Sequence, residues 1–80
     1  MDLKYVRHSI VGFILWPRTD DLWHSHVGKV LPKAGRIESA GFASLAGGKV
    51  RCGGGSESLH INSRPDDSEA LAAQLGLKAA

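Results

Sequence analysis

The chain has 80 residues, so we expect residues 1–80 to fold as one domain, with a hydrophobic core only just large enough to keep it stably folded. Its single cysteine, Cys52, excludes an internal disulfide, and its apolar run at residues 10–16 is far too short to span a bilayer. Ten Lys and Arg against eight Asp and Glu give a formal net charge of +2, which is thin for binding a nucleic-acid backbone. We therefore expect a cytoplasmic protein that has no membrane partner, and the charge gives little support for nucleic acid as a partner.

Residues 10–16 read Ile-Val-Gly-Phe-Ile-Leu-Trp and end at Pro17. Successive side chains of a strand point to opposite faces, so the run predicts a strand from Leu3 to Trp16 in the middle of a sheet covered on both faces. Eighty residues with two helices cover one face well and the other only partly. A second copy of the chain is a natural second cover, and the run therefore predicts a homo-oligomer.

A helix and a hairpin follow. Apolar residues recur at helical spacing between an N-cap at Thr19 or Asp20 and a stop at Pro32, which predicts an amphipathic helix. Residues 36–46 and 49–53 flank two glycines, the turn expected of a β-hairpin. The first hairpin strand is rich in Ala, Gly and Ser, and small residues in a strand mark a place where another backbone or a ligand approaches closely.

The last third of the chain predicts one more helix. Residues 53–56 indicate a bend or mobile loop, and residues 59–61 an optional edge strand. A capping box at Ser63 and Asp66 precedes a helix that ends at Gly76, and residues 77–80 are expected to fray unless Leu77 packs. The order β-α-β-β-(β)-α predicts an α+β two-layer sandwich with three to four strands and two helices.

The histidines do not form a metal-binding pattern. His24 and His26 lie two residues apart on the predicted helix, where side chains point about 200° apart and cannot share an ion. We expect His26 in the core-facing stripe and His24 in solvent. No local signature of a nucleophile surrounds Cys52 or the serines near His60, so we expect neither catalysis nor a cofactor.

Two regions are candidates for binding an anion. The glycine-rich segment 53–56 offers backbone N–H groups beside basic side chains, and the end of the first strand offers aromatic, guanidinium and hydroxyl groups. A mobile loop with solvated arginines, and tryptophans buried in a core or dimer interface, are the competing interpretations. The candidate ligand-binding residues are Trp16, Arg18, Thr19, Trp23, Arg51, Ser56, His60 and Arg64.

Three functions follow from these patterns. The first is a small non-enzymatic, homo-oligomeric binding protein that holds an anionic nucleotide-like or phosphorylated small ligand. The second is a protein-interaction or inhibitor protein of the kind encoded by phages and mobile elements, which acts on a host protein. The third is a weak nucleic-acid binder, for which neither the charge nor any motif gives support.

Overall fold

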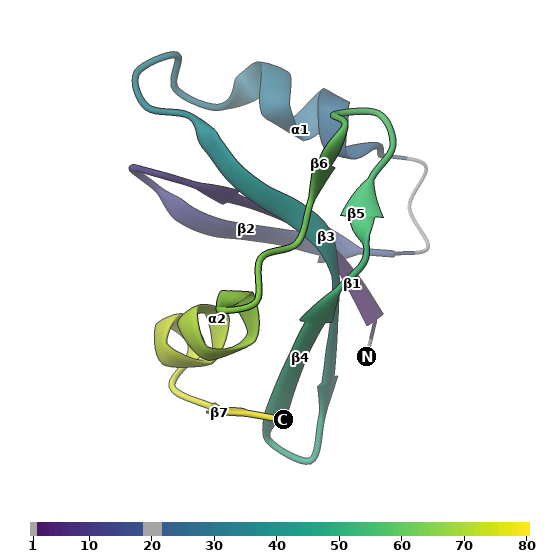
Figure 1. The fold of residues 1–80 in the computed structure, drawn as a ribbon, viewed down its shortest axis with the longest axis vertical. Helices are drawn as coiled ribbons and strands as arrows, with labels where there is room; N and C mark the ends of the chain where they lie inside the picture. The colour runs from purple at the N-terminus through teal and green to yellow at the C-terminus, as the bar shows by residue number, and fades with distance from the viewer. Residues whose placement is uncertain (1, 19–21) are drawn as a thin grey trace.

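The computed structural model describes residues 2–18 and 22–80 and has the order β-β-α-β-β-β-β-α-β (Figure 1). The elements are β1 Asp2–His8, β2 Gly12–Pro17, α1 His24–Val30, β3 Ile37–Ala46, β4 Lys49–Gly53, β5 Gly55–Ser56, β6 Ile61–Asn62, α2 Asp67–Leu75 and β7 Lys78–Ala79. One sheet has the strand order β2-β1-β3-β4-β7, and β5 and β6 form a second, small sheet. The α+β class is confirmed. The predicted order and strand count were only roughly right.

The predicted strand from Leu3 to Trp16 is two antiparallel strands, β1 and β2, joined by a tight turn. The His8 ring closes this turn, because its Nδ1 accepts the backbone N–H groups of Ile10 at 3.1 Å and Val11 at 3.4 Å. Gly12 follows with a φ of +81°. The apolar run therefore begins in an exposed turn and continues in an edge strand, so its predicted place in the middle of the sheet was wrong.

The chain itself covers both faces of the large sheet. Phe13 and Leu15 of β2 pack into a core cluster beneath α2, whereas Ile14 and Trp16 pack into another beneath α1. The run is thus apolar toward both faces, as predicted. The second face of the sheet is covered by α1 and the segment around β6. Because helices lie on both faces, the predicted two-layer sandwich was wrong. The argument for a second copy loses its basis, and homo-oligomerisation stays a prediction.

Helix α2 crosses one face of the sheet from β4 to β2. Its Ser68 Oγ accepts the backbone N–H of Cys52 on β4 at 2.8 Å. One residue before its end, Gln74 makes two hydrogen bonds to the backbone of Phe13 on β2. The Gln74 bonds occupy backbone groups of β2, an edge strand that would otherwise invite pairing with another chain.

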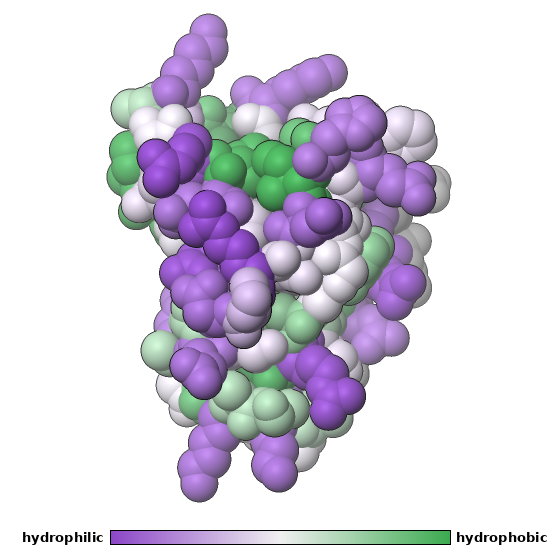
Figure 2. Space-filling view, in the orientation of Figure 1, coloured by the Kyte–Doolittle hydropathy of each residue, from purple (hydrophilic) through white to green (hydrophobic). Residues whose placement is uncertain are grey.

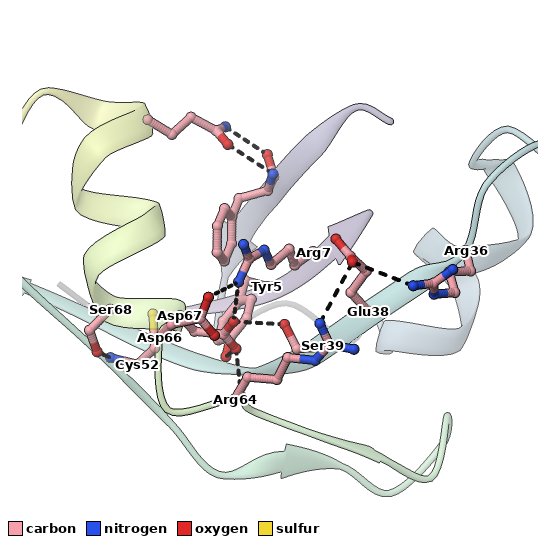
Figure 3. Close-up of polar contacts among 12 residues, drawn as sticks. Tyr5, Arg7, Arg36, Glu38, Ser39, Cys52, Arg64, Asp66, Asp67 and Ser68 are labelled. Carbon is pink, nitrogen blue, oxygen red and sulfur yellow. Dashed lines mark hydrogen bonds and ion pairs between the residues drawn. The ribbon is translucent and has the colours of Figure 1, made fainter. Parts of the chain in front are cut away.

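A buried carboxylate fixes the start of α2. Asp67 is fully buried and accepts hydrogen bonds from Tyr5 Oη at 2.5 Å, Ser39 Oγ at 2.9 Å and Arg7 Nη1 at 3.0 Å (Figure 3). It also accepts the backbone N–H of Arg64 at 2.9 Å. The predicted capping box at Ser63 and Asp66 was wrong, because the N-cap is Asp66 and its side chain makes no capping hydrogen bond. Because the acceptors of Asp67 are satisfied, we assign the cluster a structural role.

The predicted hairpin is confirmed as β3 and β4, and both turn glycines have positive φ, as a type I′ turn requires. Small residues in β3 do mark a close approach of backbone. A Cβ at Gly41 would lie 2.4 Å from the carbonyl oxygen of Gly53, so only glycine fits there. The C-terminal residues are also ordered, because β7 pairs in parallel with β4.

No helix in the described ranges is long and apolar enough to cross a membrane. Hydrophobic surface gathers at the end of the molecule where α1 lies, with hydrophilic residues around it (Figure 2).

Candidate ligand-binding groove

Two adjoining hollows lie on the face of the sheet that carries α1. The larger, which we call the aromatic hollow, has a volume of about 460 Å³ and is lined by Trp23, His24 and Phe42, with polar groups at its margin. The smaller, the arginine hollow, has a volume of about 240 Å³ and is lined by Arg18, Phe42 and Arg51 with the backbone of the glycine segment. Phe42 lines both hollows, so they adjoin at its ring, and we call the two together the groove.

His24 forms a rigid wall of the aromatic hollow. Its side chain is buried, and its ring makes edge contacts with Trp16 at 5.3 Å and Phe42 at 5.6 Å between centroids. Its Nε2 donates to the carbonyl oxygen of Gly41 at 2.8 Å. Burial lowers the pKa of His24, so the ring is neutral at pH 7. The expectation that His24 is solvated and His26 faces the core was wrong, because α1 presents the opposite side.

Trp23 precedes α1 and remains 59% exposed, unlike the buried Trp16. Its ring stacks on His26 with 5.7 Å between centroids, and the His26 Nδ1 accepts the Trp23 backbone N–H at 3.1 Å. This bond orders the start of the helix without a conventional capping side chain. Trp23 therefore supplies the accessible indole of the groove.

The arginine hollow joins a cation to an aromatic face. The guanidinium carbon of Arg18 lies 4.4 Å from the centroid of Phe42. A guanidinium stacked through its face keeps its N–H groups available at its edge for a planar anion. In residues 2–18 and 22–80, neither Arg18 nor Arg51 forms an ion pair with a carboxylate, although Asp2 also lines the hollow.

The glycine segment forms a bend that a backbone hydrogen bond ties to the chain ahead of α2. Gly54 has a φ of +71°, and its carbonyl oxygen accepts the backbone N–H of Ser63 at 2.9 Å. A Cβ at Gly54 would lie 3.1 Å from the ring of Phe42. The segment therefore packs closely against the floor of the groove, and its role as an anion nest stays a prediction.

The structure brings three of the eight predicted site residues to the groove, namely Arg18, Trp23 and Arg51. The other five lie elsewhere or cannot be placed. Trp16 is buried in the core, where its Nε1 donates to the Leu22 carbonyl oxygen, and Ser56 is buried with its Oγ accepting the Leu59 N–H. His60 lies in an exposed turn, and Thr19 lies outside the described residues. Arg64 pairs with Glu38 at 3.6 Å beside the Asp67 cluster (Figure 3).

Sequence reasoning missed Phe42 and Lys4, which also line the aromatic hollow. Phe42 was visible as the one aromatic residue within a strand of small side chains, a pattern that leaves it accessible from one face. Lys4 pairs in register with Trp16 and therefore shares its face of the sheet, but this requires knowing that the first strand folds back on itself.

Among the residues that the structure describes, no group of three or more His, Cys, Asp or Glu side chains is placed to hold a metal ion. Comparison with protein-family models, curated proteins and solved structures finds no significant match. The geometry of the groove therefore carries the functional argument.

Proposed function

We propose that this is a non-enzymatic binding protein that holds an anionic, nucleotide-like or phosphorylated ligand in the groove. The observation that carries the proposal is the stack of Arg18 on Phe42, which puts a guanidinium beside an aromatic ring where the two hollows meet. A nucleotide carries an aromatic base and a phosphate, which match an aromatic ring and a guanidinium respectively. The larger hollow alone is within the roughly 300–1,000 Å³ typical of small-molecule sites.

Each half of such a ligand has a matching part of the groove. An aromatic base would lie against Trp23 and Phe42 in the aromatic hollow, where stacking and burial of apolar surface stabilise it. A phosphate would lie between Arg18 and Arg51, whose N–H groups make charge-assisted hydrogen bonds to its oxygens. Base and phosphate would therefore occupy different hollows.

The nearby ionisable groups favour binding over catalysis. Burial, reinforced by the charge of Asp67, raises the pKa of the Cys52 thiol to about 11, so the thiol is not a nucleophile at neutral pH. The neutral His24 ring is held by its bond to Gly41 and packed between two aromatic rings. Neither group is placed as a poised nucleophile or base.

Isothermal titration calorimetry with AMP tests the proposal. Arg18→Ala and Arg51→Ala should each weaken binding about ten- to a hundredfold, because a hydrogen bond to a charged group contributes about 1.5–3 kcal/mol. Arg36→Ala is the matched control, since Arg36 is exposed and lines neither hollow. The proposal fails if no nucleotide binds, or if the control weakens binding as much as the groove variants do.

The exposed apolar side chains favour docking of a protein as a second candidate function. Ile10 is 62% exposed at the turn between β1 and β2, and Val30 is 82% exposed at the end of α1. Contiguous apolar surface with a polar rim marks interaction sites, and hydrophobic surface gathers at the α1 end of the molecule (Figure 2). Sedimentation of the wild type and of Val30→Asp would distinguish self-association, which the variant should abolish, from a groove function, which it should leave intact.

A further inference from the structure

The groove continues beyond the two hollows described above. A third hollow of about 240 Å³ shares Ser44 and Arg51 with the arginine hollow and is also lined by Ala46, Lys49 and Ala80. Phe42, Ser44 and Ala46 are alternate residues of β3, so they point to one face and the three hollows follow one another along this strand. Phe42 and Ala46 are four residues apart, which is roughly 13 Å along an extended strand. The proposed base and phosphate occupy only the first two hollows, so the third is left for a further part of the ligand.

The far end of the groove is open. The third hollow reaches the turn between β3 and β4, where a Cβ on either Gly47 or Gly48 would meet no atom within 4 Å. A ligand that lies along β3 could therefore leave the sheet at this end without a clash. An open end suits a chain-like ligand, whereas a closed end would suit a small molecule.

Basic side chains line each of the three hollows. Arg51 and Lys49 are two residues apart on β4, so their side chains share a face and are spaced by roughly 6.6–6.8 Å. Arg18 precedes them at the Phe42 junction, and Lys4 lines the aromatic hollow. Asp2 and Glu57 also line the groove, so the excess of positive charge is moderate.

We propose that the groove binds single-stranded nucleic acid, with one base in the aromatic hollow and successive phosphates over Arg18, Arg51 and Lys49. This inference rests on the proposed function and names its ligand class. Accessible aromatic rings beside a cationic groove are the two elements by which proteins hold single strands, because unpaired bases can stack while the backbone follows the charges. The bases of a duplex are already stacked and cannot reach Trp23 or Phe42.

Fluorescence anisotropy with labelled oligothymidylates tests the inference, with unlabelled TMP and a duplex of equal length as competitors. We expect the hexanucleotide to bind at least about tenfold more tightly than TMP, and the duplex to compete poorly. Lys49→Ala should weaken hexanucleotide binding more than TMP binding. It should also reduce the slope of log affinity against log salt by about 0.7 for one lost phosphate contact.

Lys33→Ala is the matched control, because Lys33 is exposed and lines none of the hollows. If TMP and the hexanucleotide bind equally well and Lys49→Ala has no selective effect, the strand inference is overturned while the groove remains a nucleotide site. Equal competition by the duplex also overturns it. If neither TMP nor the hexanucleotide binds, both the inference and the proposed function fail.

Discussion

The side-chain amide of Gln74 pairs with the backbone of Phe13 as a neighbouring strand would. Its Oε1 accepts the Phe13 N–H at 3.0 Å, and its Nε2 donates to the Phe13 carbonyl oxygen at 3.1 Å. One side chain of α2 thereby occupies both backbone groups of a residue on the edge strand β2. Pro17 at the end of the same strand has no N–H to offer. The edge is thus protected from pairing with another chain.

Gln74→Ala should expose this edge. We expect a loss of about 1–3 kcal/mol in the free energy of unfolding, because two neutral hydrogen bonds each contribute about 0.5–1.5 kcal/mol. Urea denaturation measures the loss, and light scattering at high concentration measures association. Gln74→Glu keeps an acceptor for the Phe13 N–H but sets a carboxylate oxygen against the Phe13 carbonyl oxygen, so it should lose at least as much stability. A Gln74→Ala protein as stable and monodisperse as the wild type would refute the edge-capping role.

Asp67→Asn should be far more destabilising than Asp66→Asn. Asp67 is fully buried, whereas the Asp66 side chain is 62% exposed, although both carboxylates contact Arg7. Asparagine keeps one acceptor oxygen but puts an NH2 donor in place of the other, so the bonds at that oxygen are lost together with the buried charge that faces Arg7. This loss should cost about 3–5 kcal/mol, against less than about 1 kcal/mol for the exposed carboxylate. Chemical denaturation of the two variants compares these costs, and similar losses would contradict the account.

The Asp67 cluster should also set the acid limit of stability. Burial alone would raise the pKa of Asp67, but hydrogen bonds from Tyr5, the Arg64 backbone, Ser39 and Arg7 outweigh it and hold the pKa below its usual range. The stabilisation is therefore present above the unfolded value of about 3.9 and is lost as the pH falls through the lower folded value. Unfolding midpoints measured from pH 7 to pH 2 should show this acid limb, and Asp67→Asn should lack it.

Tyr5 should limit stability at the alkaline end. Burial and the hydrogen bond to Asp67 raise the pKa of Tyr5 well above its ordinary value of 10. The folded protein binds the phenol proton more tightly than the unfolded chain, so the stabilisation is present below pH 10 and is lost as the pH rises above it. Tyr5→Phe should flatten this alkaline limb in unfolding experiments between pH 9 and pH 11. An unchanged limb would show that another group causes it.

The elements that the sequence predicted best have local signals. The Gly47-Gly48 turn requires only its own two residues to adopt positive φ, and Gly76 ends α2 in the same conformation. The turn between β1 and β2 has no such dipeptide. It depends on the His8 ring accepting two backbone N–H groups, which composition and periodicity do not reveal.

The groove was only partly predictable for a related reason. Arg18, Trp23 and Arg51 were recognised as chemically suitable, but their proximity depends on how strands far apart in sequence pair. The charge of +2 spread along the chain hides the cations that folding gathers on one face. Ser56 and Arg64 are chemically similar to groove residues, yet the bend at Gly54 takes them into other contacts.

An NMR titration of ¹⁵N-labelled protein with AMP tests the central claim most directly, because it shows where on the sheet a ligand binds. We expect progressive shifts at Phe42, Arg51 and the Arg18 side-chain Nε, with no shift at Ser68 or Gln74 on the α2 face. Perturbations that follow this pattern support a nucleotide-binding groove. A spectrum unchanged by saturating AMP, or shifts confined to the α2 face, would contradict it.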